Sequence, residues 1–228
     1  MQHLKICDCD TTVTIPFTER IRQTSALGQE WFAYMEEGSC PPNILKSQNI
    51  KLKLDLNMKI LIVSGSLRKE SLTRVLTDIA YEYAKKNYDD VEYLDLRKTR
   101  INNFEGFEAQ YDENTDKTIK LVQNSDVFIL GCPVYNGLIG SALKNLFEFV
   151  DYKALERKIA GFIVKSGSNI SFLQVQGQLQ ALMNYFRVIS NPRAVFVTDE
   201  DFEGMKLKNR KIEGRIKRLI DETVEMKR

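Results

Sequence analysis

The chain has 228 residues and a formal net charge of +2, from 33 Lys and Arg against 31 Asp and Glu. This balance argues against nucleic-acid binding as the function, because proteins that bind nucleic acids carry a clear excess of basic residues. No apolar run approaches the roughly 20 residues that cross a bilayer, and the four cysteines are too few for a scaffold built on disulfides. We therefore expect a globular protein of the cytoplasm that binds neither nucleic acid nor membrane.

Residues 1–57 precede the first regular strand pattern and read as a separate N-terminal arm. Apolar residues at helical spacing predict an amphipathic helix over 17–35, and Pro41-Pro42 follows it. Strict alternation of apolar and polar residues predicts a half-buried edge strand over 50–56. We therefore divide the chain into an arm, 1–57, and a main domain, 58–228.

The main domain alternates regularly between apolar runs and amphipathic segments. The apolar runs predict five strands, at 60–63, 91–96, 127–132, 158–164 and 194–198. Apolar residues at helical spacing predict helices at 71–86, 116–123, 139–150, 172–186 and 208–227. This alternation, with helices long enough for right-handed crossovers, predicts an α/β fold with a five-stranded parallel sheet and helices on both faces.

Three predicted loops, after the first, third and fourth strands, are rich in small polar residues. In open parallel sheets, ligands bind beyond the carboxyl ends of the strands, where the strand order reverses. The loop after the first strand combines backbone N–H groups and a helix N-terminus with the hydroxyls of Ser66 and Ser71 and the charge of Arg68. These features are typical of a phosphate site. The alternative is an ordinary strand-to-helix turn that binds no ligand.

The three loops together resemble the NADPH-dependent FMN reductase family, which has a flavodoxin-like fold. Gly65-Ser66-Leu67-Arg68-Lys69-Glu70-Ser71 is similar to the family's G-S-x-R-x-x-S phosphate loop. Cys132-Pro133-Val134-Tyr135-Asn136-Gly137, followed by Leu143-Lys144-Asn145, is similar to its S-P-x-Y-x-G and L-K-N segments. Ser166-Gly167-Ser168 stands where the family usually has two glycines. The resemblance covers residue 58 to about residue 197 and leaves out the arm; Cys132 and Ser168 depart from the family pattern.

The resemblance implies an NAD(P)H-dependent FMN oxidoreductase that passes hydride from NADPH or NADH to the flavin and on to a small acceptor, such as free flavin or a quinone. Ser66, Arg68, Ser71 and Thr73 would hold the FMN phosphate, with Ser64 and Leu72 in the same loop region. The residues that would run along the flavin ring are Pro133, Val134, Tyr135, Asn136 and Gly137, and those that would close the far side are Ser166, Gly167, Ser168 and Asn169. No side chain is expected to be catalytic, because the flavin carries the hydride chemistry.

Members of this family are commonly dimers, so the resemblance also implies a homodimer, with a tetramer as the alternative. The apolar helix and strand predicted in the arm need a surface to pack on, and we expect the arm to contribute to the subunit interface.

Two other functions are compatible with the residues. The first is a non-enzymatic FMN-binding module that transfers electrons to a partner protein, and steady-state oxidation of NAD(P)H would distinguish it from a reductase. The second is a metal site in the arm formed by His3, Cys7, Cys9 and Cys40, but Cys-x-Cys spacing fits structural zinc poorly, so we expect no metal. The sequence leaves open the physiological acceptor and the choice between NADH and NADPH.

Overall fold

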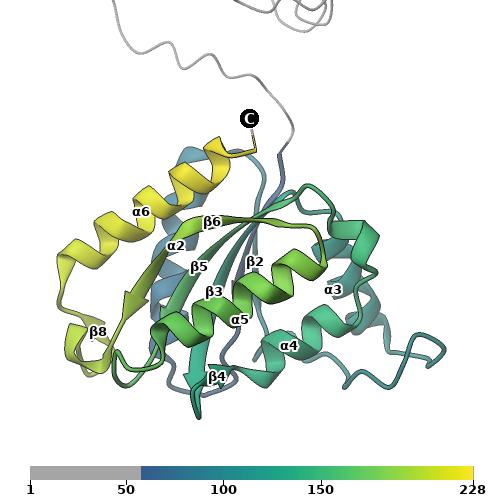
Figure 1. The fold of residues 1–228 in the computed structure, drawn as a ribbon, viewed down its shortest axis with the longest axis horizontal. Coiled ribbons are helices and arrows are strands. Elements are labelled where there is room, and N and C mark those ends of the chain that lie inside the picture. Colours follow the sequence, from purple (N-terminus) through teal and green to yellow (C-terminus); the bar gives the residue numbers. More distant parts are fainter. Residues whose placement is uncertain (1–57, 228) are drawn as a thin grey trace, which may run out of the picture. The chain divides into compact units, whose positions relative to one another are not determined.

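The computed structural model describes residues 58–227 (Figure 1). The predicted arm, with its helix at 17–35 and its strand at 50–56, lies outside the described residues. The four residues weighed as a metal site in the arm lie outside them as well. Within the described residues, no three His, Cys, Asp or Glu side chains are grouped so that they could hold a metal ion. The same part of the chain contains no helix that is both long and apolar enough to span a membrane.

Five parallel strands form the sheet at the centre of the domain, in the order β2-β1-β3-β5-β6. The strands are β1 (Ile60–Ser64), β2 (Val91–Asp95), β3 (Val127–Tyr135), β5 (Ile159–Lys165) and β6 (Ile189–Val197). This confirms the predicted parallel sheet and its flavodoxin-like fold class. A short sixth strand, β4 (Leu138–Ile139), which was not predicted, pairs antiparallel with the end of β3.

Helices cover both faces of the sheet, as the sequence predicts (Figure 1). Helices α2 (Leu72–Asn87) and α6 (Arg210–Glu225) pack on one face. Helices α3 (Glu113–Gln123), α4 (Ser141–Glu148) and α5 (Phe172–Tyr185) pack on the other. The remaining secondary structure of the described residues consists of two 3-10 helices, Tyr152–Leu155 and Asp199–Asp201, and a small hairpin of β7 (Phe202–Glu203) and β8 (Lys206–Leu207).

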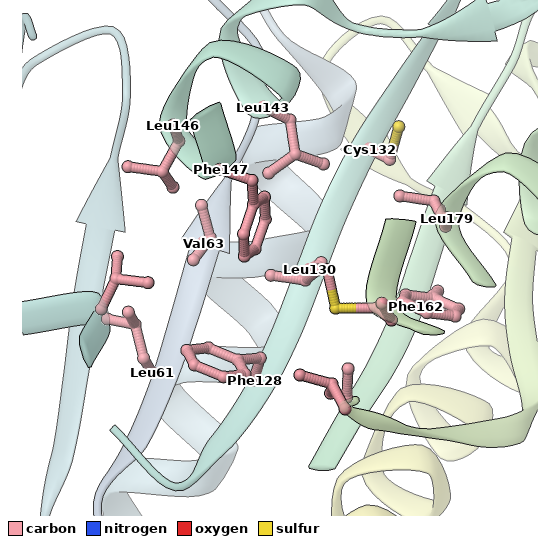
Figure 2. Packing of buried hydrophobic residues seen from close by; sticks show 14 of the residues in the cluster. Leu61, Val63, Phe128, Leu130, Cys132, Leu143, Leu146, Phe147, Phe162 and Leu179 are labelled. Atoms are coloured by element: carbon pink, nitrogen blue, oxygen red, sulfur yellow. The ribbon is translucent and has the colours of Figure 1, made fainter. Parts of the chain in front are cut away.

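The central strands are buried on both faces, which explains their nearly continuous apolar sequence. In β1, Ile60 and Ile62 point to the core under α2 and α6, whereas Leu61 and Val63 point to the opposite core. Figure 2 shows the second of these cores, in which Leu143 and Phe147 of α4 lie over the sheet. Because side chains alternate along a strand, each core receives every second residue. The sheet is therefore held from both sides, and its carboxyl edge is a rigid platform for the loops.

Two strand boundaries differ from the prediction by more than one residue. Strand β3 continues past residue 132 through Pro133 to Tyr135, where its partner β4 keeps it extended. Strand β6 begins at Ile189, whereas the prediction placed its start at residue 194. The misleading signal was Pro192, which lacks a backbone donor and normally argues against a strand. Here β6 is an edge strand, and its pairing with β5 shifts register between Ala160 and Phe162. A proline is tolerated at such a position.

Candidate functional site

The loop between β1 and α2 lies directly against strand β3. The Gly65 N–H donates a hydrogen bond of 2.8 Å to the carbonyl oxygen of Gly131. A Cβ on Gly65 would lie only 2.8 Å from that same oxygen, which is closer than real Cβ contacts allow. The chain therefore needs glycine at this position so that the loop can leave β1 at the point where the strand order reverses.

Ser71 ends this loop and starts α2. Its backbone is extended, and its side chain accepts a hydrogen bond of 3.2 Å from the Arg74 N–H, so it is the N-cap of the helix. The hydroxyl residues Ser66, Ser71 and Thr73 are all buried. The loop and the first turn of α2 thus form one ordered unit, with the positive end of the helix dipole facing the loop.

The backbone N–H groups of the loop are its distinctive feature. In the described part of the chain, the N–H groups of Ser66, Leu67, Lys69 and Glu70 have no hydrogen-bond acceptor, and the Arg68 N–H makes only a long contact of 3.4 Å with Ser66 Oγ. The exposed Arg68 guanidinium likewise has no partner among these residues. The Lys69 ammonium beside it also has no partner among the described residues. Several unpaired donors and free cations in a short loop are the arrangement that binds a phosphate dianion.

The second loop is a tight hairpin between β3 and β4. Asn136 and Gly137 both have positive φ, 50° and 75°, and Tyr135 pairs with Leu138 across them. A two-residue turn with positive φ at both positions is the type I′ turn that Asn-Gly favours. The hairpin presents Tyr135, which is 40% exposed, with its hydroxyl 3.4 Å from Ser66 Oγ. The first and second predicted loops therefore meet.

The third loop follows β5 and is adjacent to the second. Lys165 pairs in register with Pro133, so both strands end at the same edge of the sheet. The nearly buried Lys165 ammonium donates to Asp199 Oδ1 at 2.6 Å and to the Ser166 carbonyl oxygen at 2.8 Å. The Ser166 N–H donates to the Val197 carbonyl oxygen. These bonds fix the base of the loop and leave its tip, Gly167 to Asn169, exposed.

The three loops predicted from sequence thus lie together at the carboxyl edge of the sheet. The sequence-predicted site residues that the structure buries are Ser64, Ser66, Ser71, Thr73, Pro133 and Ser166; Leu72, Val134 and Gly137 are half-buried, and Arg68, Tyr135, Asn136, Gly167, Ser168 and Asn169 are exposed. Ser64 differs from the others because its Oγ has less than 1 Å² of accessible surface and no hydrogen-bond partner. It lies beneath the surface that a ligand would touch.

A sequence model of the NADPH-dependent FMN reductase family matches residues 58–203. The chain belongs to this family. An NAD(P)H-dependent FAD/FMN reductase from Geobacillus thermodenitrificans is 32% identical over 173 residues, which is 74% of this chain and 93% of that protein. An FMN-dependent NADPH-azoreductase from Staphylococcus aureus is 28% identical over 150 residues, 64% of this chain and 79% of that protein.

Solved structures of FMN reductase relatives share the fold. FerB, a flavoenzyme NAD(P)H:(acceptor) oxidoreductase from Paracoccus denitrificans, matches with a TM-score of 0.61 at 19% identity, covering 75% of this chain and 97% of that one. The apo form of the NADH:FMN oxidoreductase EmoB matches with a TM-score of 0.62 at 17% identity, covering 73% and 88%. At these identities the likeness concerns the fold alone.

This family member departs from the usual motif at Cys132, and the structure shows the consequence. Cys132 is fully buried in the core beneath α4 and α5 (Figure 2). Burial raises the pKa of its thiol to about 12, and a backbone hydrogen bond from Gly140 offsets only part of this effect. The thiol is therefore neutral and inaccessible, and it acts as a small apolar core residue rather than as a nucleophile.

The side chains that hold the first loop and the loop after β2 were not predicted from the sequence. Asn145, in the L-K-N segment, accepts from the Phe104 N–H at 2.9 Å and donates to the Asn102 carbonyl oxygen at 2.8 Å, so it fixes the loop between β2 and α3. Arg74 and Arg97 contact carbonyl oxygens of the loop after β1, and Asp95 accepts from Arg74. No short-range pattern identifies these contacts. The β3–β4 hairpin did have a local signal, the dipeptide Asn136-Gly137.

Proposed function

We propose that the protein is an NAD(P)H-dependent FMN oxidoreductase that reduces a small diffusible acceptor, with the cofactor phosphate bound by the loop between β1 and α2. The single observation that carries this proposal is the set of unpaired N–H groups in that loop, beside the free guanidinium of Arg68. A phosphate dianion accepts hydrogen bonds only, so the unpaired N–H donors of this loop and its exposed cations, Arg68 and Lys69, fit it well, although the loop also carries one carboxylate, Glu70.

Three features of the chain support FMN in particular. The loop lies at the point where the strand order reverses, because the chain runs from β1 to β2 on one side of the sheet and from β3 to β5 on the other. Mononucleotides bind at this point in such sheets. The exposed ring of Tyr135 stands beside the loop and offers a flat apolar surface. The backbone of the β3–β4 hairpin and of the third loop supplies polar groups at the same edge. We assign Ser66, Arg68, Ser71 and Thr73 to the phosphate end on this basis.

When bound, FMN supplies the chemistry of accepting hydride from a nicotinamide and delivering electrons to an acceptor. The protein's part is to bind the cofactor, to orient it and to shield it. The rigid edge of the sheet places the first loop and the hairpin in fixed positions, and the neutral, buried Cys132 leaves no competing thiolate beside them.

The surface around the three loops favours a flat, weakly polar acceptor. Exposed apolar side chains come from all three of them: Leu67, Tyr135, Leu138, Ile170 and Leu173. Exposed apolar groups that border a binding site favour planar aromatic molecules, so we propose free flavin or a quinone as the acceptor class. The relatives named as a FAD/FMN reductase and an azoreductase act on molecules of this shape.

Anaerobic mixing tests the proposed activity. NADPH or NADH, added to the FMN-loaded protein, should bleach the flavin absorption band nearly stoichiometrically, and re-oxidation by a quinone or by free flavin should restore it. If neither nicotinamide bleaches the flavin, the protein is an electron-transfer module and the reductase proposal is wrong. Steady-state rates with a panel of acceptors and both nicotinamides then identify the preferred pair.

We also propose that the protein is a homodimer in the cytoplasm. Large apolar side chains away from the three loops are exposed in the described chain, among them Phe107 and Tyr185 at 70% and 68%. Isolated exposed apolar groups are normal on a monomer, so these two rings are available to a subunit interface, and the dimer itself is proposed from the resemblance to the family. Light scattering on the full-length protein tests this proposal, and a molecular mass equal to one chain at working concentration would overturn it.

A further inference from the structure

Arg74 makes an unusual number of contacts with the loop that precedes it. Its Nη2 donates to the carbonyl oxygens of Ser66 and Arg68 at 3.3 and 3.2 Å, and its Nη1 donates to that of Lys69 at 3.1 Å. Its Nε donates to Asp95 Oδ2 at 2.8 Å. The side chain is only 15% exposed. Each of the three nitrogens of this guanidinium is therefore engaged by the protein.

Arg97 contacts the one carbonyl oxygen of this stretch that Arg74 does not reach. Its Nη1 donates to the Leu67 carbonyl oxygen at 3.1 Å. Two guanidinium groups thus bind four consecutive carbonyl oxygens, from Ser66 to Lys69. These contacts set the direction of four successive peptide groups of the loop.

Asp95 at the end of β2 supports both arginines. Its carboxylate accepts from Nε and Nη2 of Arg74 at 2.8 and 3.4 Å and from the Arg97 N–H at 3.0 Å. Asp95 is 4% exposed and lies in register with Ser64, the last residue of β1. The parallel pairing of β1 and β2 therefore brings a buried carboxylate beside the start of the loop, where it holds the guanidinium of Arg74 and the backbone N–H of Arg97.

The planarity of the peptide unit links these contacts to the ligand site. In a trans peptide, the carbonyl group of one residue and the N–H of the next point in opposite directions. Drawing the carbonyl groups of Ser66 to Lys69 toward the arginines therefore turns the N–H groups of Leu67 to Glu70 the other way. Three of these, on Leu67, Lys69 and Glu70, are the unpaired donors of the proposed phosphate site.

We propose that Arg74, held by Asp95, is a positioning residue that orients the phosphate loop for its anion without touching the anion. The proposal rests on the function proposed above. Arg68 supplies the charge that meets the phosphate, whereas Arg74 and Arg97 act from behind the loop by fixing its peptide planes.

The test compares the affinity of each variant for FMN and for riboflavin, which lacks the phosphate. Arg74→Gln should weaken FMN binding by about 10- to 100-fold, the range for losing hydrogen bonds made by a charged group. Riboflavin affinity should change by less than about threefold, since its ring contacts are untouched. Arg74→Lys should not restore FMN binding, because one ammonium group cannot replace a planar fork that reaches Asp95 and three carbonyl oxygens. Flavin fluorescence titration measures both affinities.

Arg193→Gln is the matched control. It also removes an arginine–carboxylate pair, with Glu222 at 3.1 Å, but it lies between β6 and α6, away from the loop. It should leave the ratio of FMN to riboflavin affinity at the wild-type value.

A second measurement needs no flavin. Arg68 and Lys69 are exposed trypsin sites inside the loop, and an ordered loop resists cleavage. In the apoprotein, Arg74→Gln should speed cleavage after these two residues relative to other sites, and Asp95→Asn should act in the same direction. The masses of the fragments, followed over time, measure the rates of cleavage at each site.

The outcomes separate the positioning role from the function on which it rests. Wild type that binds FMN and riboflavin equally would refute the phosphate site, and the positioning role with it. If wild type prefers FMN and Arg74→Gln keeps that preference, only the positioning role is overturned. Equal weakening of both flavins with a lower melting temperature would overturn it too, because Arg74 would then be only a stabilising residue.

Discussion

The Tyr135 hydroxyl lies 3.4 Å from Ser66 Oγ, although 69 residues separate the two side chains in sequence. At this distance the hydrogen bond is weak and adds little stability, but it shows that the two side chains are neighbours. It marks the contact between the loop after β1 and the hairpin after β3. Ser66 is buried and Tyr135 is 40% exposed, so the pair joins the base of the phosphate loop to an accessible aromatic face.

Arg68→Ala tests the charge that we assign to the phosphate. We expect FMN affinity to fall by about 10- to 100-fold, because a charge-assisted contact is lost. Riboflavin should bind poorly to wild type and be indifferent to the change. Fluorescence titration measures both. Arg100→Ala removes an exposed cation from the neighbouring loop and is the control. A similar loss of FMN affinity in Arg100→Ala would show that general surface charge, not Arg68, attracts the cofactor.

Gly65→Ala tests the close approach of the first loop to β3. The added Cβ meets the Gly131 carbonyl oxygen at 2.8 Å, and backbone cannot move aside as a side chain can. We expect a loss of about 1–3 kcal/mol in the free energy of unfolding, typical of overpacking, together with weaker FMN binding. Urea denaturation and fluorescence titration measure the two effects.

Gly177→Ala is the matched control for this substitution. Gly177 is in α5, and a Cβ there meets nothing within 4 Å. It should raise the free energy of unfolding by about 0.5–1 kcal/mol, because alanine favours a helix over glycine. Equal responses at residues 65 and 177 would contradict the argument from close approach.

Cys132 should be inert in the folded protein. Its thiol is buried and its pKa is raised to about 12 by that burial, so at about pH 8 almost no thiolate exists for a reagent to modify. Alkylation with iodoacetamide, followed by mass spectrometry of the peptide that contains Cys132, should find it unmodified in the native state and modified after unfolding in urea. Rapid native-state modification would show that the core around β3 opens on the timescale of the reaction.

Asp201 should make stability depend on pH. Burial acts to raise the pKa of this carboxyl, but hydrogen bonds from Thr198 and Asn209 outweigh it, so the pKa lies below the ordinary value. A carboxyl with a lowered folded-state pKa adds stability above its unfolded-state pKa of about 3.9 and loses this contribution as pH falls through the folded value. Asp201→Asn should therefore lower the melting temperature at about pH 7, and the difference from wild type should shrink below about pH 4.

Calorimetry across this pH range measures the effect. A difference that stayed constant from neutral to acidic pH would mean that the ionised carboxylate adds nothing, and that only the shape of the side chain matters at the turn before β7.

Local sequence patterns were enough to predict the sheet and the first loop. Ile60 to Val63 are apolar at every position, which is required of a strand buried on both faces, and Gly65, Arg68 and Ser71 have the spacing of a turn, a cation and a helix cap. Such signals depend on nearest neighbours along the chain, so they are readable without coordinates. The hairpin at Asn136-Gly137 was equally readable from its dipeptide.

Only the tertiary structure revealed which side chains bind the carbonyl groups of the loop after β1. Arg74 and Asp95 are 21 residues apart, and Arg97 and Leu67 are 30 apart, with no period or motif that connects them. They meet because β1 and β2 pair in parallel with Ser64 opposite Asp95, a register set by the burial of both strands rather than by any local preference. The edge position of β6, which accommodates Pro192, is likewise a property of the whole sheet. The motifs of the candidate site are thus local in sequence, whereas the contacts that hold the first loop in place depend on the packing of the sheet.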